Sequence, residues 1–205
     1  MLAFKFADYK DKLAYPLCVQ PKLNGIRMLY QAGVCQTRHE KVWASSKFPH
    51  IREALKSLPS NIILDGELYI HGKSLQQINS LCSVHPNAVV KANELDLDYH
   101  VFDCVDTNNL SATFLQRIDL LHRLCFFISR PVQLVPTMQV AEPSVAEQAY
   151  SDYKANGYEG LMYRDSSSPY GLDFLCSNKE NRWKFLLKRK TLLRQKLPHL
   201  NMLPF

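Results

Sequence analysis

Alternating apolar and polar positions dominate the first third of the chain and predict a series of strands. The segments PLCVQPKL and RMLYQAG flank Asn24-Gly25, a pair that two-residue hairpin turns prefer because it tolerates positive φ angles. We therefore predict a β-hairpin around these two residues. VCQTRHEKVWA is expected to continue the same sheet, and NIILDGELYIHG predicts a further strand that bends at Gly66.

Helical and extended segments then follow one another along the rest of the chain. Apolar residues at helical spacing predict helices over FPHIREALKSLPS, SLQQINSLCSV and ATFLQRIDLLHRLCFF. SVAEQAYSDYKANG predicts a fourth helix, with Ser144 as N-cap, Glu147 as its capping-box partner and Gly157 as its stop. The remaining predicted strands are DLDYHVFDCVD, VQLVPTMQV, YEGLMYRD and RWKFLLKRK.

This order of elements defines the expected fold class. Strands that follow one another outnumber β-α-β units, so we predict an α+β fold with mostly antiparallel sheets flanked by helices. The 205 residues, 46% of them hydrophobic, suffice for one large domain with a real core. No apolar run is long enough to span a membrane, and the first residues lack the apolar core of a secretory signal.

Cysteine usage and charge narrow the setting further. The six cysteines form no C-x-x-C pair and mostly lie beside apolar residues, so we expect reduced, buried thiols rather than disulfides or zinc ligands. The formal net charge is +6, and from Lys179 onward eight basic residues face a single acidic one, Glu180. Such a run is either a solvated charged surface or a phosphate-binding strand with its surroundings.

Several charged residues stand at the ends of strands or inside them, where a solvated surface would not place them. Lys22 precedes the predicted turn, Glu67 and Glu159 lie within strands, and Lys188 and Lys190 end an apolar run on the same strand face. Each has an ordinary explanation by itself, as a turn lysine, an exposed strand residue or a charge that protects a sheet edge. Their order along the chain is more informative.

The order resembles that of the covalent nucleotidyltransferases, and specifically the ATP-dependent DNA ligases. KLNGIR, from Lys22 to Arg27, resembles the nucleotidyl-lysine signature K-x-D-G-x-R, and TRHEKVW carries Arg38 where these ligases place an arginine. LDGEL, YHVFD, YEGLMYR and LLKRK are similar, in this order, to the motifs that follow in the family. The resemblance runs from the first residues to about Lys190 and implies the nucleotidyltransferase fold.

The family chemistry agrees with the residue types. A lysine amine is protonated near neutral pH, so an attacking lysine such as Lys22 needs nearby cations or a divalent metal that favour its neutral form. Lys188 and Lys190 would then hold the α-phosphate of ATP and the departing pyrophosphate. Glu159 together with Glu67 would hold Mg²⁺ or Mn²⁺.

The resemblance also implies roles for residues that composition and spacing leave unassigned. Glu67 would contact the ribose, Phe102 would stack on adenine, and Gln20 would contact the adenine edge. Arg27 and Arg38 would bind the ribose or the 5′-phosphate of nicked DNA, since a guanidinium suits phosphate geometry.

The implied reaction has three steps: formation of a lysyl-AMP, transfer of AMP to the 5′-phosphate at a nick, and sealing by the 3′-hydroxyl. The expected partners are ATP and nicked double-stranded DNA, with no membrane. A monomer is expected, located in the cytoplasm or at the nucleoid as in viral or bacterial members. Its pathways would be DNA replication, repair and recombination.

Two features depart from the family pattern. Asn24 stands where most DNA ligases have aspartate, which keeps an oxygen acceptor but removes a negative charge, so we expect reduced rather than abolished activity. Family members continue after the fifth motif into an OB-fold domain, whereas residues 191–205 predict only a short basic tail. We therefore expect an adenylation domain over residues 1–190, with the C-terminal OB-fold domain absent, and impaired self-adenylylation and nick sealing.

Alternative functions share part of this pattern. An RNA ligase or an mRNA-capping guanylyltransferase uses the same lysine chemistry, and the nucleotide that labels Lys22 would separate the ATP-dependent from the GTP-dependent case. A non-catalytic DNA-binding remnant would keep the fold and the basic charge but form no adduct.

Overall fold

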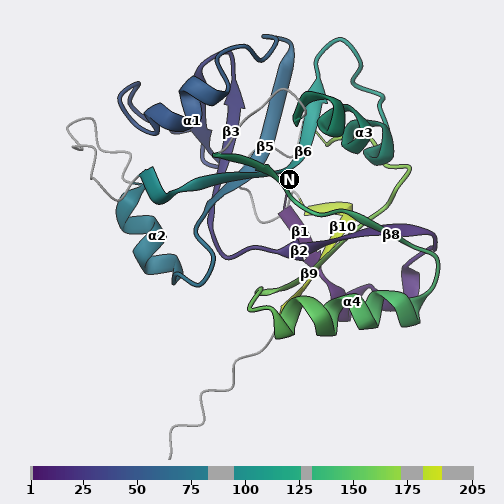
Figure 1. The fold of residues 1–205 in the computed structure, drawn as a ribbon. Coiled ribbons are helices and arrows are strands. Elements are labelled where there is room, and N and C mark those ends of the chain that lie inside the picture. Colours follow the sequence, from purple (N-terminus) through teal and green to yellow (C-terminus); the bar gives the residue numbers. More distant parts are fainter. Residues whose placement is uncertain (1, 83–94, 126–130, 172–181, 191–205) are drawn as a thin grey trace, which may run out of the picture.

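The chain folds around two five-stranded sheets with helices on their outer faces (Figure 1). The structure is a computed structural model that describes residues 2–82, 95–125, 131–171 and 182–190. Within these ranges no helix is long and apolar enough to cross a lipid bilayer. Both sheets are antiparallel except for one parallel strand pair in each, which confirms the predicted α+β class.

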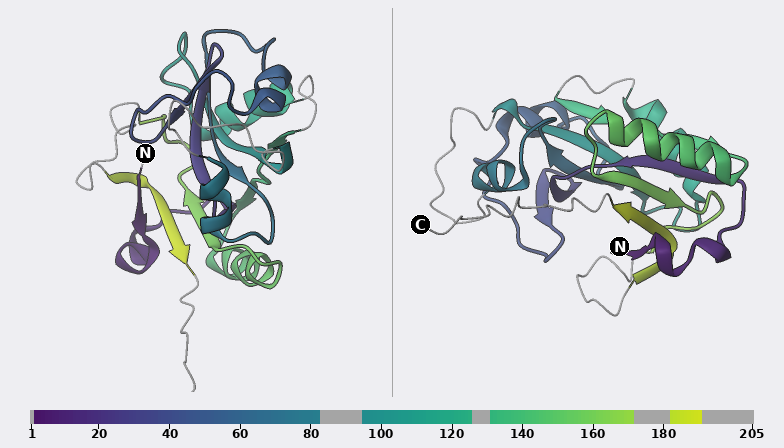
Figure 2. Two further views of the ribbon diagram at one scale, coloured as in Figure 1. Left: turned by 90° about the vertical axis from the view of Figure 1, so that its left-hand side faces the viewer. Right: turned by 90° about the horizontal axis from the view of Figure 1, so that it is seen from below.

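The first sheet contains the strands on which Lys22, Lys188 and Lys190 lie. Its order is β1-β10-β9-β2-β8, with bounds Leu2–Lys5, Arg182–Lys190, Gly160–Arg164, Leu17–Lys22 and Met138–Val140. The helix α4 (Pro143–Ala155) lies along one face of this sheet, as the view from below shows (Figure 2). Two short 3₁₀ helices, Phe6–Asp8 and Lys10–Lys12, follow β1.

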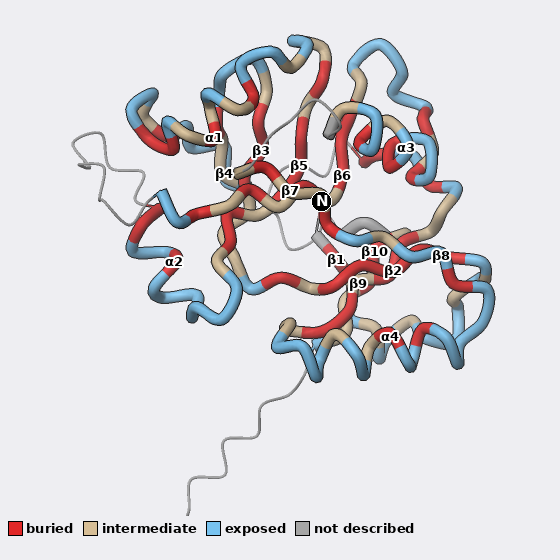
Figure 3. Tube along the Cα trace, viewed as in Figure 1, coloured by how far each residue is buried: buried red, intermediate tan, exposed pale blue. Residues whose placement is uncertain are grey.

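The second sheet carries the larger hydrophobic core. Its order is β4-β3-β5-β6-β7, with bounds Val34–Thr37, Ile26–Gln31, Ile62–Tyr69, Asp98–Asp106 and Val132–Leu134. The helices in this half are α1 (Pro49–Ala54), α2 (Leu75–Leu81) and α3 (Phe114–Cys125). Buried positions follow the strands of both sheets, and the helices expose their outer sides (Figure 3).

The predicted hairpin around Asn24-Gly25 is wrong. β2 pairs with β9 and β8, whereas β3 pairs with β4 and β5, so the chain crosses from one sheet to the other between them. Gly25 does not have a positive φ angle. A Cβ atom there would lie 2.4 Å from the carbonyl oxygen of Leu68, so glycine permits a close backbone approach. Alternation identifies strands but does not identify their partners.

A second crossing corrects another predicted strand. VQLVPTMQV is not one strand, because β7 joins the second sheet and β8 joins the first, with Val135, Pro136 and Thr137 between them. The predicted strand over VCQTRHEKVWA is also shorter than expected. β4 ends at Thr37, and only an isolated bridge between Gln36 and Val42 continues the pairing.

The helix ends show which sequence signals were decisive. Ser144 is not the N-cap of α4: Pro143 occupies the first turn, the N-cap is Glu142, and Ser144 Oγ donates a 2.8 Å hydrogen bond to that glutamate. Proline lacks an N–H and its φ angle suits the first helical position, so it sets the start of the helix. Gly157, with φ of +82°, follows the end of α4 as predicted.

The described cysteines agree with the expected reduced thiols. Cys18, Cys35, Cys82 and Cys104 are free and buried. Cys176 and the side chain of Cys125 lie outside the described residues, as does the predicted basic tail 191–205.

Candidate active site

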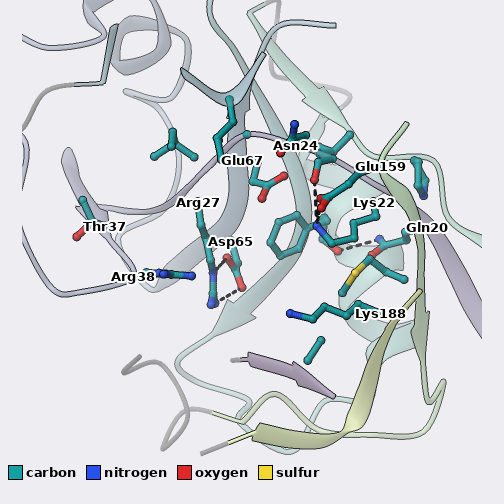
Figure 4. Close-up of a pocket in the computed structure, with 18 of the residues that line it drawn as sticks. Gln20, Lys22, Asn24, Arg27, Thr37, Arg38, Asp65, Glu67, Glu159 and Lys188 are labelled. Carbon is teal, nitrogen blue, oxygen red and sulfur yellow. Dashed lines mark hydrogen bonds and ion pairs between the residues drawn. The ribbon is translucent and has the colours of Figure 1, made fainter. Parts of the chain in front are cut away.

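An open pocket of about 1050 Å³ lies between the two sheets and brings the predicted site residues together. Its walls include residues from strands of both sheets (Figure 4). Every side chain that the sequence analysis assigned to the site lines this pocket: Gln20, Lys22, Arg27, Arg38, Glu67, Phe102, Glu159, Lys188 and Lys190. Residues more than 160 positions apart in the sequence thus face one space, while their individual roles stay predictions.

Lys22 is the last residue of β2 and takes part in a three-residue charge cluster. Its Nζ forms an ion pair with one carboxylate oxygen of Glu159, and Lys190 Nζ pairs with the other oxygen. The backbone also joins these segments, because the Glu159 N–H donates a 2.9 Å hydrogen bond to the Lys22 carbonyl. The side chains of Lys22, Glu159 and Lys190 are 15%, 20% and 49% exposed, so solvent and ligands can reach the cluster.

The two lysines set the charge state of this carboxylate. Partial burial acts to raise the pKa of Glu159, but hydrogen bonds from Lys190 and Lys22 outweigh burial and leave its pKa below the ordinary value. Glu159 is therefore a carboxylate at neutral pH. It is available to a cation as soon as a lysine moves away.

The opposite wall holds a different kind of ion pair. Arg27 on β3 donates to both carboxylate oxygens of Asp65 on β5, at 2.8 Å from Nε and 2.7 Å from Nη2. The Tyr170 hydroxyl donates to the same carboxylate at 2.7 Å. Burial acts to raise the pKa of Asp65, but the guanidinium charge and these hydrogen bonds have the larger effect. The pKa of Asp65 therefore lies below its ordinary value.

Asp65 and Tyr170 were missed as site residues by the sequence analysis. Asp65 lies in LDGEL, where the family pattern directed attention to Glu67. The available signal was a second carboxylate two positions before Glu67 on the same strand face.

Glu67 is a partly buried carboxyl opposite Arg27 in the β3–β5 register. Burial, with a contribution from the Glu159 charge, raises its pKa to about 7, although Lys22 and Arg27 act in the opposite direction. A neighbouring cation would draw this group back to the charged form.

These two carboxyl groups fit the metal that the family implies. Mg²⁺ usually binds through one or two carboxylates, with waters and substrate phosphates completing its shell. Glu159 and Glu67 supply that number, and the described residues contain no group of three or more metal-ligating side chains. Both line the same pocket.

Gln20 and Phe102 both line the pocket and are joined by a hydrogen bond. Gln20, only 1% exposed, donates from Nε2 to the Phe102 carbonyl at 3.0 Å and to Thr137 Oγ1 at 2.8 Å. Its Oε1 accepts from Arg164 Nε at 2.7 Å, and the Arg164 guanidinium lies 5.2 Å from the Phe102 ring centroid. Both amide hydrogens of Gln20 thus have protein acceptors, while the predicted adenine contact is untested.

Arg38 and Asn24 lie at the exposed rim. Arg38 follows β4 directly, and its Nε donates to His39 Nε2 at 3.1 Å. Asn24 is an exposed residue of the segment that crosses between the sheets. Lys188 extends into the pocket from β10, on the opposite side from Arg38 (Figure 4).

Comparison with known proteins assigns the class of protein that this fold and pocket define. The sequence model of the ATP dependent DNA ligase domain matches residues 1–188, so the chain belongs to this family. The prediction from the motifs is thereby confirmed at the level of the family.

Individual relatives place the chain within that family. It is 28% identical over 182 residues to a DNA ligase of African swine fever virus (isolate Pig/Kenya/KEN-50/1950), covering 80% of this chain and 39% of the viral protein. The DNA ligase of African swine fever virus (strain Badajoz 1971 Vero-adapted) is 29% identical over 165 residues, or 74% of this chain and 37% of that protein. The chain therefore spans about two fifths of the length of these curated relatives.

Solved structures share the fold. A Chlorella virus DNA ligase-adenylate superposes with a TM-score of 0.69 at 22% identity, over 92% of this chain and 66% of that one. The ATP-dependent DNA ligase of bacteriophage T7, in complex with ATP, gives a TM-score of 0.61 at 16% identity, over 92% and 67%. At these identities the likeness shows the fold alone.

Proposed function

We infer that this chain carries the nucleotidyl-transfer chemistry of an ATP-dependent DNA ligase. The observation that carries this proposal is the cluster of Lys22, Glu159 and Lys190 in an open pocket between the two sheets. Membership of the ligase family supports it, because the same pocket holds every side chain at which the family motifs point.

In the first step Lys22 Nζ forms a bond to the α-phosphorus of ATP, and the bond from that phosphorus to the bridging oxygen breaks to release pyrophosphate. An ion-paired ammonium cannot attack, so Lys22 must first separate from Glu159 and lose a proton. Lys190 already contacts the other oxygen of that carboxylate, so Glu159 keeps a cationic partner when Lys22 leaves.

Charge neutralisation and positioning supply most of the rate in such transfers. Lys188 and Lys190 extend from one strand face toward the space where the phosphates would lie. Glu159 and Glu67 would hold Mg²⁺ or Mn²⁺, which neutralises phosphate charge when bound. Phe102 would stack on adenine beside Gln20, and Glu67 would contact the ribose.

The second and third steps extend to the rim of the pocket, where Arg38 lies. Arg38, together with Arg27 on the adjoining wall, would bind the 5′-phosphate of nicked DNA while AMP is transferred to it from Lys22. The 3′-hydroxyl would then attack this phosphate and release AMP as the strand is sealed.

Labelling with nucleotide tests the first step. Incubation with α-labelled ATP and Mg²⁺ should label wild-type protein, whereas α-labelled GTP and the variant Lys22→Ala should give no adduct. Label from GTP alone would favour a capping guanylyltransferase, and label that survived Lys22→Ala would assign another nucleophile.

Nicked substrates test the later steps with the same preparation. Sealing of a DNA nick in preference to an RNA nick supports a DNA ligase, and the reverse preference supports an RNA ligase. Salt-sensitive DNA binding without any adduct, even at high pH and high Mg²⁺, would support the non-catalytic remnant instead.

A further inference from the structure

Strand β10 has two differently used faces. Leu186, Lys188 and Lys190 line the pocket. The residues between them face the other way: Leu187 is buried in the core under α4, and Arg189 lies on the same side. This alternation follows from the two-residue period of a strand, so whatever holds Arg189 also orients its two lysine neighbours.

Arg189 is held by three kinds of contact on that outer face. Its Nη2 donates a 2.9 Å hydrogen bond to Glu147 Oε1 on α4, and its Nη1 pairs with the other oxygen of that carboxylate. Its guanidinium lies 3.8 Å from the ring centroid of Tyr150 and 5.2 Å from that of Phe6. A planar guanidinium suits both two-point pairing and stacking, so the side chain joins β10 to α4 and to the first 3₁₀ helix.

The backbone is closely packed at the same position. Arg189 pairs with Leu161 and Lys190 pairs with Gly160 in the antiparallel β9–β10 register. A Cβ atom at Gly160 would lie 1.9 Å from the Arg189 carbonyl oxygen, so the two strands approach as closely as glycine allows. The residue before Gly160 is Glu159, whose carboxylate pairs with Lys190.

We propose that Arg189 is a positioning residue, which fixes the last residues of β10 on α4 so that Lys188 and Lys190 meet the phosphates of ATP. The proposal rests on the function inferred above and adds to it a residue outside the pocket. Arg189 touches neither nucleotide nor metal, and acts through the two lysines. Its partner Glu147, expected from the sequence to cap a helix, instead anchors Arg189 to α4.

Two variants of opposite charge separate positioning from a simple electrostatic effect. Arg189→Gln and Glu147→Gln each break the pair, and each should lower the single-turnover rate of lysyl-AMP formation about tenfold to a hundredfold. Arg189→Lys, which keeps the charge but not the two-point contact, should fall in between. The matched control is Arg123→Gln, which breaks the exposed Arg123–Asp119 pair on α3 and should leave the rate unchanged.

Measuring the effect of Arg189→Gln in the Lys190→Ala variant distinguishes positioning of the lysines from a general disruption of the fold. If Arg189 acts through the lysines, Arg189→Gln should cost much less in that background than in wild type, because coupled residues are not additive. A full additional loss, or opposite effects of Arg189→Gln and Glu147→Gln, would overturn the proposal.

Amide hydrogen exchange provides a readout that needs no adduct. Exchange of the peptide that covers residues 185–190 should be faster in Arg189→Gln and Glu147→Gln than in wild type or Arg123→Gln. Unchanged exchange overturns the proposal, whether or not the wild type is labelled. Absence of label in the wild type together with faster exchange would defeat the proposed function and not the anchoring of β10.

Discussion

The two walls of the pocket use ion pairs in different ways. On the side of the second sheet, Arg27 and Asp65 are 12% and 1% exposed and joined by two hydrogen bonds, with Tyr170 on the same carboxylate. On the side of the first sheet, Glu159 is shared between Lys22 and the half-exposed Lys190. The carboxylate of the buried wall is thus almost inaccessible and held at two points by one arginine, whereas that of the open wall is partly exposed and shared between two lysines that a ligand can replace.

This difference indicates that one wall is rigid and that the ion pairs of the other can rearrange. A buried, two-point pair holds the Arg27 side chain against β5 and cannot be rearranged without leaving a charge unpaired. The Glu159 carboxylate is partly exposed and shared between two lysines, so solvent weakens its ion pairs and they dissociate more readily. Under the proposed function, the groups that would move during nucleotidyl transfer lie on the wall where their movement costs least.

The largest effect should come from breaking the buried wall. Asp65→Ala leaves the Arg27 guanidinium buried without its carboxylate, and should lower the free energy of unfolding by about 3–5 kcal/mol. Glu159→Ala, on the open wall, should cost about 1 kcal/mol or less. Urea denaturation of both variants measures the difference, and equal losses would contradict the distinction between the walls.

A smaller effect, on the rate of reaction and not on stability, is expected when Glu159 on the open wall loses only its charge. Glu159→Gln should lower the rate of lysyl-AMP formation about a hundredfold, because a preorganised charge is lost from the site. Its urea midpoint should stay close to that of wild type. Glu53→Gln, which breaks an exposed pair with Lys56, serves as control and should change neither quantity. A shifted midpoint in Glu159→Gln would make its role structural.

The smallest effect concerns pH and compares two carboxyls of one strand. The pKa of Glu67 is raised from 4.5 to about 7, so the folded protein binds a proton more tightly there than the unfolded chain. Its contribution to stability is therefore lost as pH rises through that range. Asp65 has a lowered pKa, and its contribution is instead lost as pH falls.

Denaturation between pH 2 and pH 8 checks both signs, because the Asp65 contribution changes only at acidic pH and the Glu67 contribution changes between its ordinary pKa and neutrality. The free energy of unfolding of Glu67→Gln, relative to wild type, should increase as pH rises toward neutrality. The corresponding difference for Asp65→Asn should shrink as pH falls. Profiles parallel to wild type in either variant would contradict the assigned pKa direction.

Much of this architecture was predictable, because local patterns determine local structure. Ser74 and Gln77 form a capping box at the start of α2, where the pattern predicted a helix, and β6 and β10 lie where apolar runs predicted strands. Pairing was less predictable. The Asn24-Gly25 sequence is typical of a hairpin, but the pairing of β2 with β9 depends on a segment more than 130 residues away.

The site was predictable where motifs name residue types and unpredictable where partners come from elsewhere. Lys22, Glu67 and Glu159 could be placed in one pocket from their motifs alone. The role of the Asp65 carboxylate depends on its hydrogen bonds with Arg27 and Tyr170, which come from separate parts of the chain. Arg189 was likewise ambiguous, since a basic run does not show which of its members faces a ligand.

The crossing between the two sheets has a consequence for sequence comparison and protein engineering. Lys22 ends a strand of one sheet, Leu23 is buried in the core of the other, and Gly25 touches the backbone of Leu68. The interval from Lys22 to Arg27 is thus a fixed span and not a flexible turn. A residue inserted between them would displace Lys22 relative to Arg27 on the opposite wall of the pocket. The number of residues between Lys22 and Arg27 should therefore identify relatives that keep this pocket, even where the intervening residues differ in type.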